Sequence, residues 1–220
     1  MKSKLSLVFL LIIICGTVNF GQEKSMNNPF LIKWNTPFQT PPFELIKNEN
    51  YLPAFEEGIK QQKVEVDAII QNKETPTFDN TIGAMEKSGK LLTKTALVFY
   101  GLNNTITNEE MQKINQTVSP MLTKHNDDIN LNTKLFERVK YLYDQKDKLN
   151  LSPEQKMLLD NYYLDFVRGG VNLNDADKEK FRKINEELSL LGVKFGENIL
   201  KETNAVGLII DSRSRSRCRC

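Results

Sequence analysis

The sequence is poor in the side chains that enzymes most often use for nucleophilic and metal-assisted chemistry. Its 220 residues include one histidine, His125, and three cysteines, Cys15, Cys218 and Cys220. A single histidine excludes the His-Glu-x-x-His pattern, in which two histidines one helical turn apart bind zinc. The sequence also has neither a Gly-x-Ser-x-Gly turn nor a phosphate-binding loop. We therefore assign no catalytic residue, no cofactor-binding residue and no metal ligand to this chain.

The remaining candidates for chemistry have structural interpretations. His125 falls on an apolar helical stripe, four residues before Ile129 and within reach of Asp128, and we interpret it as a structural histidine. Three pairs of adjacent glutamates occur in predicted helices: Glu56 and Glu57, Glu109 and Glu110, and Glu186 and Glu187. Neighbouring side chains on a helix point about 100° apart. These pairs are therefore interpreted as solvated faces rather than as acid–base pairs.

Charge of one sign is also scarce, except at the ends of the chain. The formal net charge is +2, with 40% hydrophobic and 26% charged residues, which is ordinary globular composition. Six basic residues lie in segments 1–21 and 212–220, which contain no acidic residue, so the +2 of the whole chain becomes −4 for residues 22–211. This distribution gives no general case for binding nucleic acid.

Residues 1–21 are predicted to be a secretory signal. Lys2 and Lys4 precede an apolar run from Leu5 to Ile14, which suits a signal core and is too short to span a bilayer as a helix. Attachment of a lipid at Cys15 is the alternative, although Ile14 is larger than the residue usually found before a lipidated cysteine. We expect an exported protein, periplasmic or secreted, with no other membrane association. Because the body up to Cys218 lacks cysteine, its core must hold the fold without disulfides.

Residues 22–47 form a segment rich in proline and aromatic residues. Pro29, Pro37, Pro41 and Pro42 forbid a regular helix here. The aromatic residues between them favour an extended arm docked on the protein surface. A proline-rich ligand for a partner is the alternative.

Residues 48–211 show a helical period. The apolar stripes are Leu52, Phe55, Ile59, Val66, Ile69; then Ile82, Met85, Leu92, Phe99; then Met111, Ile114, Val118, Leu122, Ile129; then Leu135, Val139, Leu142, Leu149; then Leu158, Leu159, Tyr162, Phe166; and finally Phe181, Ile184, Leu188, Leu191, Phe195, Ile199. Each stripe predicts one helix. The last is the longest, and its spacing suits a helix packed lengthwise on another.

Local signals predict where these helices begin and end. They are a break at 73–77, a capping box from Thr107 to Glu110, a kink or split at Pro120, a cap at Asn132, a capping box from Ser152 to Gln155, a stop at Gly169 and Gly170, and a cap at Asn174. Val206 to Asp211 is the only segment typical of a strand. The sequence thus predicts an all-α array of antiparallel helical hairpins with one short C-terminal strand.

Four long stretches of this body resemble a known family. They are NPFLIKWNTPFQTPPFELIKNENYLPAFEEGIKQQ (residues 28–62), PTFDNTIGAMEKSG (76–89), KHNDDINLNTKLFERVKYLYDQKDKLNLSPEQKMLLDNYYLDFVRGGVNL (124–173) and INEELSLLGVKFGENILKETNA (184–205). They cover most of residues 28–211. In these stretches the chain resembles the N-terminal region of the peptidyl-dipeptidase Dcp branch of the thimet oligopeptidase family.

The resemblance implies an architecture and an activity for the whole enzyme. Members are zinc metallopeptidases that cut short peptides, with two helical halves flanking a deep channel, and the signal-bearing form resembles the exported version of Gram-negative bacteria. Zinc and its His-Glu-x-x-His helix belong to the other half of the enzyme. The resemblance therefore implies that this segment forms a channel wall that restricts substrates to oligopeptides. By itself the chain is expected to be inactive and to bind no zinc.

The resemblance ends at residue 211. The last nine residues, SRSRSRCRC (212–220), are basic and are interpreted as sequence foreign to the family on a truncated gene. Binding of RNA or anionic lipid by the arginines, or of a soft metal by the two cysteines, is the alternative.

Three functions remain open at this point. The chain is expected to be the N-terminal fragment of an exported zinc oligopeptidase. The alternatives are a standalone helical module that binds peptides or proteins without catalysis, and an arginine-tailed interaction protein. If the first is right, the last stripe should remain exposed in the chain alone.

Overall fold

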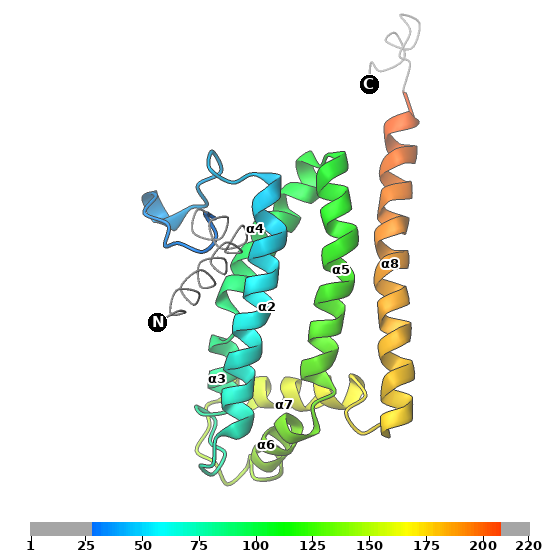
Figure 1. Ribbon diagram of the computed structural model, residues 1–220. Helices are drawn as coiled ribbons and strands as arrows, with labels where there is room; N and C mark the ends of the chain where they lie inside the picture. The colour runs from blue at the N-terminus through cyan, green and yellow to red at the C-terminus, as the bar shows by residue number, and fades with distance from the viewer. Residues whose placement is uncertain (1–27, 208–220) are drawn as a thin grey trace, which may run out of the picture.

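The computed structural model describes residues 28–207, and in that range it consists of seven α-helices and one short 3₁₀ helix (Figure 1). The elements are η1 (Pro37–Gln39), α2 (Asn48–Gln71), α3 (Ile82–Lys87), α4 (Lys90–Ile106), α5 (Glu109–Asn130), α6 (Thr133–Asp144), α7 (Pro153–Arg168) and α8 (Asp175–Ala205). The expected all-α class is confirmed for this part of the chain. The predicted strand at 206–211 lies mostly outside the described residues, and its two described residues, Val206 and Gly207, are not in a strand.

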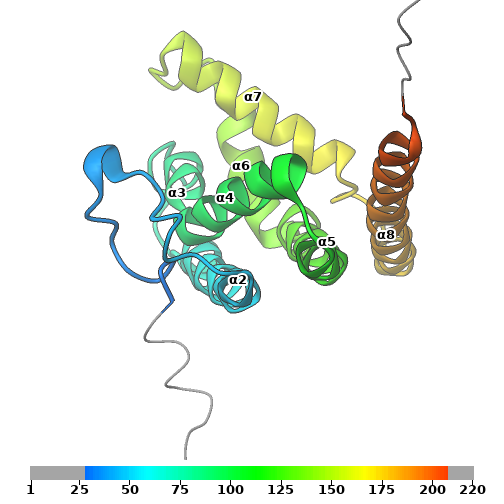
Figure 2. The ribbon, with the colours of Figure 1, turned by 90° about the horizontal axis from the view of Figure 1, so that it is seen from above.

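Successive long helices run in opposite directions. Helices α2, α5 and α8 stand side by side in a row, α4 lies behind α2 and packs on it, and α6 and α7 lie across one end of this row (Figures 1 and 2). Helix α8 rises at the edge of the row and contacts α5 as its main neighbour. Between residues 28 and 207, no helix has the length and apolar character that a membrane span requires.

Two apolar clusters hold α2 to α7 together. One lies where α2 crosses α4 and α5, and its largest members are Phe30, Tyr51, Phe55 and Phe99. The other lies at the α6–α7 end, where Leu135, Leu142, Leu159 and Phe166 are buried. Most of these residues belong to the predicted stripes, which explains why the stripes form helices here: each gains stability by burying its apolar face.

The first residues of the segment that precedes α2 are attached to α4. Phe30 is fully buried, and the ammonium of Lys94 on α4 donates to the carbonyl oxygens of Phe30 and Ile32 while lying 4.6 Å from the ring centre of Trp34. Burial lowers the pKa of Lys94. The rest of the segment is more open, and the Phe38 side chain is fully exposed.

Several predicted helix boundaries are confirmed. The side-chain oxygens of Asn132, Ser152 and Asn174 each accept a hydrogen bond from the backbone N–H three residues ahead, at 3.0–3.3 Å. Gln155 completes the capping box by accepting from the Ser152 N–H at 3.0 Å. Helix α7 ends at Gly169, and Gly170 follows with a φ of 88°, which a glycine adopts without strain.

Three boundaries were predicted wrongly. The stripe from Ile82 to Phe99 forms two helices, because Gly89 takes a left-handed conformation (φ 67°) and donates its N–H to Glu65 at 2.7 Å. The cap of α5 is Asn108 rather than Thr107, since Asn108 Oδ1 accepts from Met111 N at 2.9 Å. Of the kink or split expected at Pro120, the split is contradicted, because helix α5 continues through Pro120 with Val118 and His125 buried on either side.

Candidate functional site

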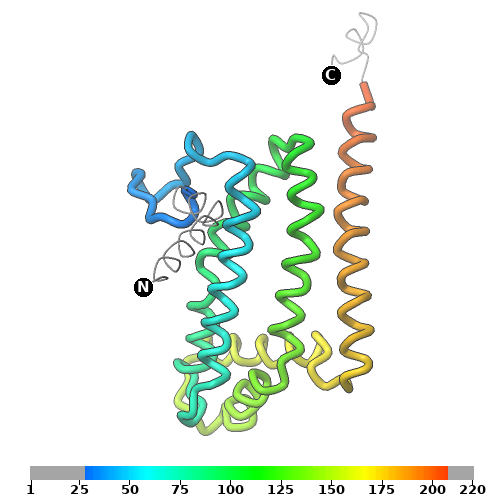
Figure 3. The backbone as a smooth tube through the Cα atoms, viewed as in Figure 1, coloured from blue at the N-terminus to red at the C-terminus, as the bar shows by residue number. Residues whose placement is uncertain are grey.

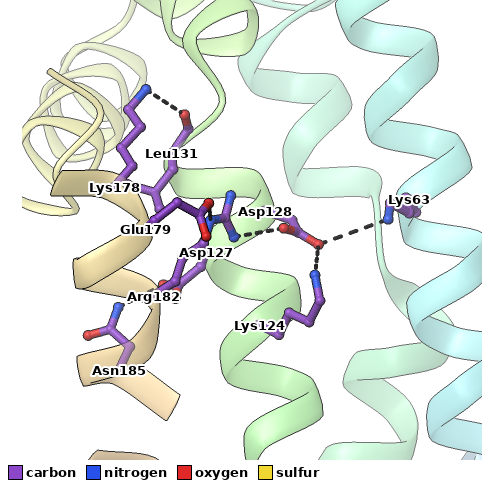
Figure 4. A network of polar contacts seen from close by, with 9 residues as sticks. All are labelled: Lys63, Lys124, Asp127, Asp128, Leu131, Lys178, Glu179, Arg182 and Asn185. Atoms are coloured by element: carbon purple, nitrogen blue, oxygen red, sulfur yellow. Dashed lines mark hydrogen bonds and ion pairs between the residues drawn. The ribbon is translucent and has the colours of Figure 1, made fainter. Parts of the chain in front are cut away.

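The most concentrated group of charges in the described chain lies where α2, α5 and α8 meet (Figure 4). Asp128 on α5 is its centre. One carboxylate oxygen lies 2.7 Å from Arg182 Nη1 of α8, and the other lies 3.2 Å from Lys124 Nζ and 3.9 Å from Lys63 Nζ of α2. A single carboxylate thus links three helices.

The neighbouring Asp127 points towards α8. Its side chain is nearly buried, with 6% of its surface exposed, and Oδ1 accepts a hydrogen bond of 2.8 Å from Asn185 Nδ2. Two turns earlier on α8, Lys178 donates to the carbonyl oxygen of Leu131 at 3.1 Å and to the Thr133 hydroxyl at 3.0 Å. A positive charge at the C-terminal end of α5 is favourable because the last carbonyls of a helix lack partners within it.

The two aspartates have opposite pKa shifts. For Asp127, burial is the main effect and raises the pKa of the carboxyl, although the Asn185 hydrogen bond and the charge of Arg182 oppose it. Burial also acts upwards on Asp128, but the hydrogen bond and charge of Lys124, with Arg182 and Lys63, outweigh it and hold the pKa of Asp128 below its usual value. Asp128 is therefore a firmly ionised partner.

A groove of about 670 Å³ lies beside this network, between α5 and α8. Its lining residues are Pro120, Met121, Lys124, Asp127, Asp128, Glu179, Arg182, Lys183 and Glu186. Both signs of charge are present, and Arg182 and Lys124 already pair with Asp128. The arrangement holds α8 against α5.

His125 does not line this groove and contacts α2 instead. It is buried, and its Nε2 lies 2.9 Å from Gln62 Oε1. The ring therefore pairs with an amide on another helix, whereas Asp128 acts on it only through its charge. Burial is the main effect and lowers the pKa of His125. This side chain joins α5 to α2, a partner that spacing along the sequence does not reveal.

The described residues do not fit a zinc ion. Across residues 28–207, no three histidine, cysteine, aspartate or glutamate side chains are placed to hold a metal. A catalytic zinc usually takes three protein ligands. The adjacent glutamates do not converge either: Glu109, Glu186 and Glu187 are exposed, Glu57 pairs with Lys60 and Gln61, and Glu110 accepts from Asn48.

The last predicted stripe is exposed. We use the name α8 stripe for Ile184, Leu188, Leu191, Phe195 and Ile199, each of which has more than half of its surface exposed. No residue of α8 is buried. The tube view in Figure 3 shows that the upper part of α8 stands at the edge of the molecule. The contacts that hold the helix are those of its polar side, including a hydrogen bond of 2.8 Å from Gln116 Nε2 to Glu197 Oε1.

Comparison with known proteins shows which class of protein contains a related sequence. No family model matches the chain. Curated relatives do, and they are peptidases, so the resemblance predicted from the four sequence stretches is confirmed as homology to their N-terminal quarter.

The relatives include bacterial and plant enzymes. The chain is 36% identical over 184 residues to dipeptidyl carboxypeptidase of Escherichia coli, and equally to that of Salmonella typhimurium; each match covers 84% of this chain and 27% of the relative. It is 24% identical over 178 residues to oligopeptidase A of Escherichia coli, covering 81% of this chain and 26% of the relative. The chain thus spans about a quarter of the length of the relatives it matches.

Proposed function

We propose that this chain is the N-terminal helical part of a zinc metallopeptidase that hydrolyses oligopeptides. The observation that carries the proposal is the 36% identity to dipeptidyl carboxypeptidase over 84% of the chain. The same region is also related to oligopeptidase A. Release of dipeptides and internal cleavage therefore both remain within the proposal, because the region is shared by enzymes of both names.

The role proposed for this segment is to shape the substrate channel rather than to perform chemistry. Helices α2, α4 and α5 share a buried core, and the Asp128 ion pairs fix α8 beside them. A wall of such helices excludes folded proteins by size while admitting short peptides. The zinc and the groups that activate its water would come from the remaining part of the enzyme, since residues 28–207 contain no group of metal ligands.

A chimera tests this role. Residues 28–207 replace the segment with which they align in Escherichia coli dipeptidyl carboxypeptidase. The chimera is assayed with a quenched fluorescent oligopeptide and with a folded protein that contains the sequence of that peptide. We expect zinc-dependent cleavage of the peptide alone. Loss of peptide cleavage in a folded, zinc-loaded chimera would contradict the proposal.

A second experiment uses the 220-residue chain by itself. With added zinc it is expected to cleave no peptide, and zinc-dependent cleavage would show that the chain carries an active site of its own. If the chimera were inactive and the chain alone bound oligopeptides in calorimetry, the standalone binding module would be the better description.

Export is part of the proposal. Residues 1–21 have the charged start and apolar core of a secretory signal. Expression in a Gram-negative host followed by fractionation should place the protein outside the cytoplasm, with an N-terminus near residue 22. Mass spectrometry of the purified protein distinguishes this cleavage from lipid attachment at Cys15.

A further inference from the structure

We propose that the α8 stripe is a docking surface for a helix of the remaining part of the peptidase. The inference rests on the proposed function and adds to it the surface through which this segment joins the catalytic part. Exposed apolar side chains in a contiguous row are typical of an interaction site. Phe195 and Leu188 are 68% and 59% exposed, although both lie in the middle of a 31-residue helix.

The stripe is directed away from the contact that α8 already makes. Lys178, Arg182 and Asn185 form the side of α8 that reaches α5. At 100° per residue, the α8 stripe lies roughly 100° around the helix axis from that polar side. Closer packing against α5 would therefore leave the stripe exposed, and another element is needed to cover it.

The spacing of the stripe specifies a helix as its occupant. Its members follow one another at intervals of four, three, four and four residues, which is the pattern of helices that pack lengthwise at a small crossing angle. From Ile184 to Ile199 the stripe is about 22 Å long at 1.5 Å per residue. A partner helix of four turns or more with its own apolar stripe matches this surface.

Two glycines of α8 lie between the α8 stripe and the side of the helix that reaches α5. Gly192 and Gly196 lie inside α8, where glycine weakens a helix. A Cβ atom added at either position would meet nothing within 4 Å in the described structure. The glycines are therefore not required by any neighbour in residues 28–207, and Gly192 lines an open groove with Ser119 and Leu122 of α5.

The relatives indicate where the partner comes from. The chain accounts for 27% of the length of dipeptidyl carboxypeptidase. Most of the relative therefore lies outside this segment. Within residues 28–207 the two buried apolar clusters draw on α2 to α7 and on the segment before α2, whereas α8 contributes no buried residue and carries a regularly spaced row of exposed apolar side chains.

Thiol labelling tests the proposal without disturbing the fold. Residues 28–207 contain no cysteine, so peptide mapping distinguishes the thiol introduced by Leu191→Cys or Leu190→Cys from those of Cys15, Cys218 and Cys220. Leu191 belongs to the stripe, while Leu190 is 45% exposed, points about 100° away from it around the same helix and serves as the matched control. Maleimide labelling of each site is followed by mass spectrometry in the 220-residue chain and in the chimera described above.

The expected result is protection of Leu191→Cys in the chimera alone. Its labelling should slow by about an order of magnitude relative to the chain, as for a site that reacts only after local opening, while Leu190→Cys labels equally fast in both. Equal labelling of Leu191→Cys in chain and chimera would overturn the proposal. So would a stable dimer of the chain in sedimentation in which Leu191→Cys is already protected, because the occupant would then be a second copy.

The outcome separates this inference from the proposed function. Peptide cleavage by the chimera reports on the function, whereas labelling reports on the docking surface. Protection of Leu191→Cys in an inactive chimera would support docking and contradict the function. Free labelling in an active chimera would do the reverse.

Discussion

The apolar stripes of helices α2 to α7 and of helix α8 have similar spacing in the sequence. The stripe residues of α2 to α7 are largely buried, whereas those of α8 are exposed. In α6 the stripe residues Leu135, Val139 and Leu142 are at most 1% exposed, whereas every member of the α8 stripe is more than half exposed. Helix α8 is held instead by Arg182, Asn185 and Lys178, which bond to α5. An apolar stripe thus shows that a helix needs a partner, and only the structure shows whether this segment contains it.

The largest contrast is expected from truncating one phenylalanine in each region. Phe99 is fully buried, with ring centres of Tyr51 and Phe55 at 5.0 and 5.5 Å. Phe99→Ala should lower the free energy of unfolding by about 3–5 kcal/mol, while Phe195→Ala should change it by less than about 0.5 kcal/mol. Urea unfolding of the 220-residue chain measures both, and equal losses would show that α8 is packed in solution.

A second contrast uses glycine and should differ in sign between the regions. A Cβ atom at Gly58 on α2 would lie 2.9 Å from the Cα of Leu92 on α4, where neither backbone can yield cheaply. Gly58→Ala should therefore destabilise the chain by about 1–3 kcal/mol. Gly192→Ala meets open space and should stabilise α8 by roughly 0.5–1 kcal/mol.

Thermal melts followed by circular dichroism distinguish the two glycine variants. A rise in melting temperature for Gly58→Ala would mean that α2 and α4 pack less closely than described. In the chimera, by contrast, Gly192→Ala should lose its benefit if a partner helix occupies that space.

The ion pairs of Asp128 provide a smaller test of how α8 is held. Asp128→Asn removes the charge that meets Arg182 and Lys124 while keeping the size of the side chain. Partly exposed ion pairs contribute up to about 1 kcal/mol. Hydrogen exchange should therefore speed up in the amides of α8 and remain unchanged in α6 and α7; faster exchange throughout would show that the pairs stabilise the whole fold.

The smallest effect concerns pH. Burial lowers the pKa of His125 below the 6.5 of an exposed histidine, so the unfolded chain binds a proton at a higher pH than the folded chain does. Stability supplied by the neutral ring is therefore present above about pH 6.5 and falls as the pH decreases through that value towards the folded pKa. His125→Gln should flatten this part of the pH profile of the urea midpoint. An unchanged slope would assign it to another group.

Local sequence signals predicted the features that depend on neighbouring residues. Asn132, Ser152 and Asn174 cap helices because each needs only the backbone N–H three residues ahead. The break at Gly89 depends on Glu65, 24 residues away, and the setting of His125 depends on Gln62, 63 residues away. The spacing of residues along the sequence does not predict such distant partners.

The charged junction was missed for the same reason. Asp128, Arg182 and Lys63 belong to three helices and meet only when these pack. The signal that the sequence did contain was the alternation on α8, where Lys178, Arg182 and Asn185 fall on one side and the stripe on another. Two faces of different character on one helix indicate two different neighbours.

The different bonding of the two regions makes their response to salt unequal. Arg182 and Asp128 are both more than a quarter exposed, so dissolved ions reach and screen their attraction. The aromatic cluster around Phe99 is buried, and salts that are excluded from protein surfaces strengthen such burial. A higher concentration of sulfate should therefore weaken the ion pairs that hold α8 on α5 and strengthen the apolar packing of α2 to α7. The ionic strength thus changes how tightly α8 is bound to the rest of the fold.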